Sequence, residues 1–295
     1  MNATTTSVTQ SQHVGRRASE ADAKRNRICS ALLASAGFVV LLSVSAPALA
    51  AVAPSLGSEA TFAIASSTYT NTVAGTTING DICFTTGPFV TPVHTGTFGP
   101  CPGAAGGDQA AATAVLTGQP CTTITGPLEA TIVGANPPGT FPPGCYTMVG
   151  AMNISANGIV TLNGNGVYVF RSTGGAITTG ANSAIVLAGG ACAGNVFWTA
   201  VGATTLGGTS TFVGSVLDAA GVTMGLGATL SGRALAFGGT VTTNGANTIT
   251  VPAVCAVIGA GAGIPTLSGW AMIMLAGLLA VAGFAAMRSS SEPRA

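Results

Sequence analysis

The chain has very little charge. Only 6% of its 295 residues are Asp, Glu, Lys or Arg, against about a quarter in an average soluble protein. Between positions 54 and 287 it has no lysine, two arginines, one histidine and five acids. General acid–base catalysis, metal binding and nucleic-acid binding depend on clustered ionisable groups. The composition therefore predicts a protein that is not an enzyme, holds no metal or cofactor and binds no nucleic acid.

Cysteine pairs with C-x-x-C spacing are also missing. Zinc is therefore not expected. The chain has seven cysteines, of which Cys29 lies in the segment that we expect to be removed on export. An even number in an exported protein favours disulfides, and six cysteines allow fifteen pairings. The spacing leaves the choice open for Cys83, Cys101, Cys121, Cys145, Cys192 and Cys255.

What the chain does have is a repeat of about 18 to 19 residues between positions 150 and 251. Aligned repeats show two polar columns. The first column reads Ser155, Thr178, Thr205, Thr223 and Thr242. The second column reads Thr161, Ala184, Thr211, Thr229 and Thr248. Repeats of similar length with matched columns are typical of a β-solenoid, in which each coil stacks on its neighbour.

Strand alternation predicts which side chains face outward. Residues such as Val222 and Leu230 are expected inside. Thr223 and Thr229 are then expected outside, on adjacent sides of a Gly/Asn corner. A third strand in each coil is more apolar, so we expect that side to be covered. The fold predicted is all-β, a right-handed parallel β-solenoid of roughly triangular cross-section with one short α-helix packed alongside.

The remaining parts of the solenoid domain, residues 51–253, are less regular. Residues 83–107 are rich in Gly and Pro and predict an irregular cap or loop over one end of the solenoid. A helix is predicted from Asp108, as its N-cap, to Gly118, and Pro120 ends it. Residues 254–263 are predicted to be a linker.

Both ends of the chain carry membrane-related signals. Residues 1–50 combine basic residues, an apolar run and an Ala-Leu-Ala end, which predicts a signal peptide cleaved after Ala50. Near the other end, residues 270–287 form an uncharged apolar segment of about 27 Å as a helix, which is long enough to cross a bilayer. An uncleaved N-terminal anchor and a plain C-terminal anchor are the alternatives.

Residues 264–295 resemble an IPTL-type C-terminal sorting signal of Gram-negative bacteria. Such a tail joins a short motif, a membrane helix and a basic end, and implies an exosortase-like processing enzyme as a partner. The protein is then expected at the cell envelope or surface, or secreted after processing. The matching motif residues are Ile264, Pro265, Thr266, Leu267 and Trp270.

The solenoid domain resembles the microbial ice-binding protein family, an irregular β-solenoid with a flanking helix. Matching stretches include LGSEATFAIASS, TINGDI, PPGCYTM, GNVFW, SGRALA and TVTTNGANTITVP. Some members carry a T-A/G-x-T/N surface motif, which Thr179-Gly180-Ala181-Asn182 satisfies. The resemblance implies a partner that is an ice crystal surface.

The residues support the same function independently. Thr combines a hydroxyl and a methyl on a stiff side chain, so a flat row of Thr can order water at little entropic cost. A non-ice adhesin or matrix protein on another extracellular surface is the main alternative, and a solenoid enzyme acting on polysaccharides is a remote one. The candidate ice-binding residues are Thr178, Thr179, Asn182, Thr205, Thr223, Thr242, Thr211, Thr229, Ser231, Thr248 and Thr250.

Overall fold

The computed structural model of the chain describes residues 50–253, 255, 277 and 279. The predicted signal peptide lies outside these residues except for Ala50. The predicted linker lies outside except for Cys255, and the predicted sorting tail outside except for Gly277 and Leu279. Among the described residues, no helix has the length and apolarity needed to cross a membrane.

Within the described residues, nineteen strands pair side by side, and the pairings between them are parallel. The strands are β1 (Phe62–Asn71), β2 (Thr77–Asn79), β3 (Asp81–Thr86), β4 (Val93–His94), β5 (Phe98–Pro100), β6 (Thr122–Thr123), β7 (Thr140–Phe141), β8 (Gly144–Met148), β9 (Met152–Ile154), β10 (Ile159–Asn163), β11 (Tyr168–Ser172), β12 (Ile177–Thr179), β13 (Ala184–Ala188), β14 (Val196–Ala200), β15 (Thr204–Leu206), β16 (Thr211–Leu217), β17 (Val222–Met224), β18 (Thr229–Thr243) and β19 (Thr248–Thr250). The helical elements are α2 (Ala105–Gly118) and the short 3₁₀ turns η1 (Gly57–Glu59), η2 (Leu128–Ala130) and η3 (Ala193–Asn195).

The pairings form three ladders, so each complete coil has three sides. The first side contains β9, β12, β15, β17 and the ends of β18 and β1. The second contains β7, β10, β13, the starts of β16 and β18, and then β19, β2 and β4. The third contains β6, β8, β11, β14, the later part of β16, the middle of β18, and then β1, β3 and β5. The predicted three-sided parallel solenoid is confirmed.

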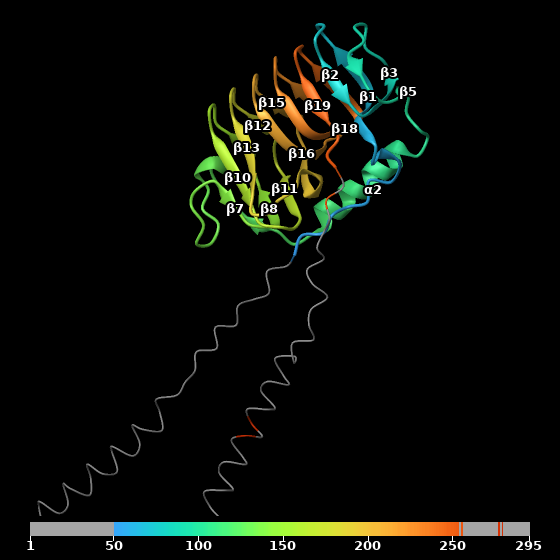
Figure 1. The fold of residues 1–295 in the computed structure, drawn as a ribbon. Helices are drawn as coiled ribbons and strands as arrows, with labels where there is room; N and C mark the ends of the chain where they lie inside the picture. Colours follow the sequence, from blue (N-terminus) through green and yellow to red (C-terminus); the bar gives the residue numbers. More distant parts are fainter. Residues whose placement is uncertain (1–49, 254, 256–276, 278, 280–295) are drawn as a thin grey trace, which may run out of the picture. The chain divides into compact units, whose positions relative to one another are not determined.

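The order of the coils departs from the order of the sequence. Strand β1, from the start of the domain, pairs with β18 near its end, and β19 pairs with β2. Figure 1 shows this junction, where orange β19 lies beside cyan β2. The N-terminal coil therefore stacks on the C-terminal coil and extends the same ladders.

An aromatic stack fills the core behind the third side. Phe170 pairs in register with Tyr146 on one side and Trp198 on the other. The Phe170 and Trp198 ring centroids are 4.2 Å apart with planes 12° apart. Trp198 has no exposed surface, and its indole N–H donates to the Val213 carbonyl at 2.8 Å. The repeat thus places large side chains at the same depth in successive coils.

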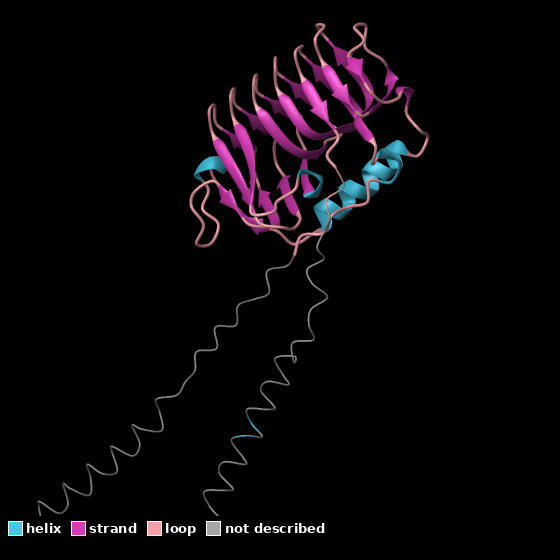
Figure 2. Cartoon of the chain, in the orientation of Figure 1, coloured by secondary structure: helices cyan, strands magenta, loops and turns pink. Residues whose placement is uncertain are grey.

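Helix α2 covers the third side, as Figure 2 shows. Its buried residues Ala105, Gln109, Ala112 and Leu116 form one stripe at helical spacing. They pack against a second apolar cluster on the outer surface of this side, which includes Phe197 and other residues of the strands. The most apolar side was predicted to be covered, and helix α2 is the element that covers it.

The predicted start of this helix was wrong. The helix begins at Ala105 and Asp108 lies in its first turn, although it ends at Gly118 as predicted. The Asp108 carboxylate accepts hydrogen bonds from the Ser58 amide at 2.7 Å and the Ser58 hydroxyl at 2.5 Å. Because it is used to hold η1 against α2, this carboxylate does not cap its own helix.

The segment 83–107 is more regular than predicted. It contains part of β3 and all of β4 and β5, which continue the second and third ladders by one further partial coil.

The six described cysteines form three disulfides. These bonds are Cys83–Cys101, Cys121–Cys145 and Cys192–Cys255. The first of them ties the end of this segment back to β3.

Candidate functional site

The first side carries a continuous row of outward residues, which we call the threonine ladder. Strand pairing places them opposite one another on six successive coils. Stacked strands lie about 4.8 Å apart, so the row is about 24 Å long. Its members, in spatial order, are Asn153, Thr178, Thr205, Thr223, Thr242 and Thr70.

The surroundings of the threonine ladder are small and uncharged. Four residues on the corner side of the row are Ser155, Gly180, Gly207 and Gly225, and three on the other side are Ala151, Ala176 and Ala203. A Cβ at Gly225 would lie 2.6 Å from the Gly208 nitrogen of the next coil, so the chain approaches its neighbour closely there. At these seven positions no side chain is larger than the central threonine, so the surface beside this part of the row is flat.

Side chains that alternate with the ladder anchor it from inside. Thr204 has no exposed surface, and its hydroxyl donates to the Asp218 carboxylate at 2.6 Å. Thr243 is also buried, and its hydroxyl donates to Asn71 Oδ1 at 2.9 Å. These bonds cross between strands and turns, and therefore restrict movement of the ladder that they support.

The second side is less uniform. Its main outward row contains Thr211, Thr229 and Thr248, followed by Thr77 of β2. Ser231 and Thr250 form a parallel row two residues later, and both are exposed. Toward one end of the stack these rows turn apolar. Ile159 lies in line with the main row and Val186 in line with the second row, and they are 58% and 44% exposed.

In the first of the aligned repeats, both predicted columns were wrong by two residues. Thr178 pairs with Asn153 and not with Ser155, so Asn153 is the ladder residue of that coil. In the second column, Ala184 pairs with Ile159, while Thr161 lies two residues further along the strand. The repeats before residue 200 differ in turn length. The alignment by sequence therefore placed Ser155 and Thr161 in the two columns, each two residues beyond the residue that actually pairs there.

The T-A/G-x-T/N motif lies at the corner between the two sides. Thr179 is only 3% exposed, and its hydroxyl accepts a hydrogen bond from the Gly207 amide at 3.0 Å. Asn182 is exposed with φ of 57°, and its side-chain oxygen accepts a hydrogen bond from the Thr209 hydroxyl on the next coil. The outward placement of Thr179 was therefore wrong, and the motif shapes the turn.

The charged residues of the late coils support the backbone. Asp218 is buried and also accepts a hydrogen bond from the Ala220 amide at 2.9 Å. Arg233 is 8% exposed and donates to the Ala60 carbonyl and to the Ser215 hydroxyl. Burial raises the pKa of Asp218 and lowers that of Arg233. Within the described ranges, no group of three or more His, Cys, Asp or Glu is placed to hold a metal.

Sequence reasoning missed two residues of the threonine ladder. Thr70 belongs to the N-terminal strand β1 and faces Thr242, some 170 positions later in the chain. Asn153 was passed over because a serine two residues later matched the column better. The alternating pattern around Thr70, in the stretch STYTN, was the available signal, but it could not indicate which coil lies beside it.

Comparison with known proteins identifies two regions. A family model described as Ice-binding-like matches residues 63–250. A second, described as the IPTL-CTERM motif, matches residues 262–289. The second match suggests export and placement outside the cell or at its surface, and it lies mostly outside the described residues.

Two curated relatives carry the name ice-binding protein. The one from Flavobacterium frigoris (strain PS1) is 36% identical over 113 residues, covering 38% of this chain and 40% of the relative. The one from a Colwellia species is 36% identical over 115 residues, covering 38% and 44%. The chain thus spans about two fifths of the length of these relatives.

Solved structures with the same architecture cover more of the chain. An ice binding protein from an Antarctic biological consortium is 30% identical, covers 68% of this chain and 92% of its own, and superposes with a TM-score of 0.59. The DUF3494 domain of Shewanella frigidimarina ice-binding protein 1 is 27% identical, covers 70% and 100%, and has a TM-score of 0.60.

Proposed function

Because the chain belongs to the ice-binding-like family, we propose that it adsorbs to ice through the threonine ladder of its first side. The observation that supports this choice is the unbroken register of the row over six coils. The second side carries Thr as well, but Ile159 and Val186 interrupt its hydroxyl pattern.

The chemistry of the ladder suits a solid water surface. Each Thr offers a hydroxyl that can join ordered water and a methyl that displaces it. The side chains are stiff at χ1, so little conformational entropy is lost on contact. In the part of the chain that the structure describes, no charged residue flanks the row and holds its own hydration shell. A rigid, flat and neutral array therefore needs little rearrangement to match a lattice.

The sorting motif supports a tethered location for this activity. We propose that residues 1–50 are removed on export, and that residues 264–295 act as a membrane and processing signal read by an exosortase-like enzyme in a Gram-negative envelope. N-terminal sequencing of the exported protein is expected to begin at Ala51. A mature protein that retains Cys29 would contradict this part of the proposal.

The test compares two residues of one coil. Thr205 on the first side and Thr211 on the second are both exposed and are separated by a single corner. Thermal hysteresis and ice recrystallisation inhibition are measured on residues 51–258, which contain the six cysteines. Thr205→Tyr is expected to abolish most of the activity, because the ring rises above the flat row, while Thr211→Tyr keeps it.

Both substitutions lie on the surface, so each is expected to change the unfolding free energy by no more than about 0.5 kcal/mol. Loss of activity only in Thr211→Tyr would move the ice-binding surface to the second side. Absence of any activity in the unmodified protein would reject ice binding. In that case the alternative function, an adhesin or matrix protein, is the better supported one, because the IPTL-CTERM motif also fits it.

A further inference from the structure

A groove lies between helix α2 and the turns that follow β11 and β14. Its volume is about 350 Å³, which is within the range of small-molecule sites, about 300 to 1,000 Å³. None of its lining residues belongs to the threonine ladder. Its lining includes Thr113, Thr117, Arg171, Thr173, Thr199 and Val201.

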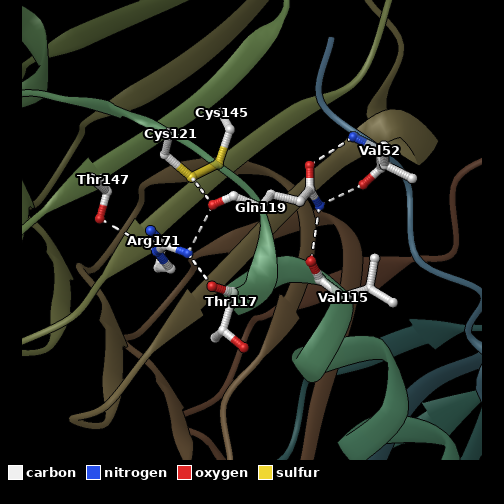
Figure 3. The surroundings of a disulfide bond; sticks show 8 residues. All are labelled: Val52, Val115, Thr117, Gln119, Cys121, Cys145, Thr147 and Arg171. Carbon is white, nitrogen blue, oxygen red and sulfur yellow. Dashed lines mark hydrogen bonds between the residues drawn. A yellow bond between two sulfur atoms is a disulfide. The ribbon is translucent and has the colours of Figure 1, made fainter. Parts of the chain in front are cut away.

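Arg171 brings a positive charge to this groove, and no acidic residue in the described part of the chain forms an ion pair with it. Its Nε donates to the Thr147 hydroxyl at 3.3 Å, and its Nη1 donates to the Thr117 carbonyl and, at 3.3 Å, to the Gln119 carbonyl. Figure 3 shows these contacts beside the Cys121–Cys145 disulfide. All three bonds go to uncharged oxygen atoms, and none of them uses Nη2.

These contacts hold the guanidinium in place at the end of α2. Carbonyl groups in the last turn of a helix lack partners within the helix, and a cation there interacts well with them. Thr117 lies in that last turn and Gln119 directly follows it. The side chain is therefore already ordered. Nη2 makes no hydrogen bond to a described residue, so its N–H groups can bind a further acceptor.

Hydroxyl groups line the groove beside this cation. The hydroxyls of Thr113 and Thr199 make no hydrogen bond within the described part of the chain, and both residues line the groove, Thr199 with only 3% of its surface exposed there. The Thr173 hydroxyl donates to the Met148 carbonyl at 3.3 Å and can still accept. Val201 is 64% exposed and adds an apolar edge.

We propose that this groove binds the carboxylate-bearing sugar unit of an acidic polysaccharide. The carboxylate accepts from Arg171 Nη2, as in other charge-assisted pairs. Thr113 and Thr199 can each donate to or accept from sugar hydroxyls, and Val201 contacts the C–H surface of the ring. One guanidinium with a single free amino group suits a singly charged carboxylate better than a doubly charged phosphate.

This site is distinct from ice adsorption and does not depend on it. A groove on the helix side could hold the protein to an anionic polymer while the first side stays free. The two activities therefore predict two separate sets of sensitive residues, one on the ladder and one in the groove.

The experiment titrates the full chain with glucuronate, glucose and acetate, and follows binding by calorimetry and amide chemical shifts. Glucuronate is expected to bind in the millimolar range and to shift signals around positions 113, 171 and 199. Glucose and acetate are expected to bind about tenfold more weakly, because each supplies only one half of the contacts.

Variants separate the groove from the fold. Arg171→Gln is expected to weaken glucuronate binding about tenfold. Because it also removes contacts to α2, Thr199→Val serves as a second variant that leaves those contacts intact and still weakens binding. Thr205→Val on the ladder is the control and keeps full affinity. Unchanged binding in Thr199→Val, equal binding of acetate, or no binding of glucuronate would each overturn the proposal.

Discussion

Glu59 is expected to make the stability of this domain depend on pH in an unusual direction. The side chain has no exposed surface, and neither carboxylate oxygen has a hydrogen-bond partner among the described residues. Burial, together with a smaller contribution from the negative charge of nearby Asp108, raises its pKa from 4.5 to about 8. The carboxyl group is therefore protonated in the folded protein at neutral pH.

The size of the pH dependence of stability follows from the pKa of Glu59 in the unfolded chain, 4.5, and in the folded domain, about 8. Between pH 4.5 and 8 the unfolded chain has lost this proton and the folded domain still holds it. Folding then takes up a proton, so stability is complete below pH 4.5 and falls as the pH rises. Each pH unit corresponds to about 1.4 kcal/mol. The free energy of unfolding is expected to fall by about 4 kcal/mol between pH 5 and 8 from this group alone.

Urea unfolding of the wild type and Glu59→Gln across this pH range measures the effect. Gln cannot ionise, so the variant is expected to lose most of the slope and to be the more stable protein at pH 8. At pH 5 the variant is expected to be equal or slightly weaker, because a buried amide is left without partners. Asp218 has a pKa raised by burial as well, and it contributes equally to both proteins.

A second variant checks the cause of the shift. Asp108→Asn removes the neighbouring charge and should reduce the slope without abolishing it, because burial is the larger of the two causes. The reasoning is refuted if Glu59→Gln keeps the slope of the wild type, or if it is less stable than the wild type at pH 8.

Three further predictions concern the framework of the ladder. Thr179→Val should lower the melting temperature but keep any ice activity, because its hydroxyl serves the Gly207 amide inside the corner. Asn71→Ala should cost about 2 to 4 kcal/mol in urea unfolding, because two buried hydrogen bonds and one partly buried one lose their partner. A Cys192→Ser and Cys255→Ser double variant should lose up to about 4 kcal/mol, because that disulfide closes a loop with a sequence separation of 63; an unchanged melting temperature would contradict this.

Local pattern alone predicted much of the domain. The coil length, the inward Val222 and Leu230, the outward Thr223 and Thr229 and the end of the helix at Gly118 all agree with the structure. Each of these depends on a period of two in strands or on a helix stop signal, and such features are set by residues close together in the chain. The low charge and the even number of cysteines are likewise properties of composition.

Other features depended on contacts between distant residues. The start of the helix was wrong because Asp108 binds Ser58, 50 positions away. Thr179 matched a surface motif, but its hydroxyl accepts a hydrogen bond from the Gly207 amide, 28 positions later, and its side chain is buried in the corner. Asn153 lies in the row because its strand pairs with the next coil in that register. A repeat alignment cannot give this register, because the turns of the two coils differ in length.

The sequence by itself determined that this chain forms parallel coils with an uncharged threonine row, because alternation and repeat length are written into each coil separately. Only the tertiary structure decided that the N-terminal coil stacks on the C-terminal one, which cysteines pair and how far the row extends. The physical reason is that strand edges are alike in every coil. The neighbour of each edge is therefore chosen by the packing of the whole stack, which places Thr70 of β1 beside Thr242 of β18.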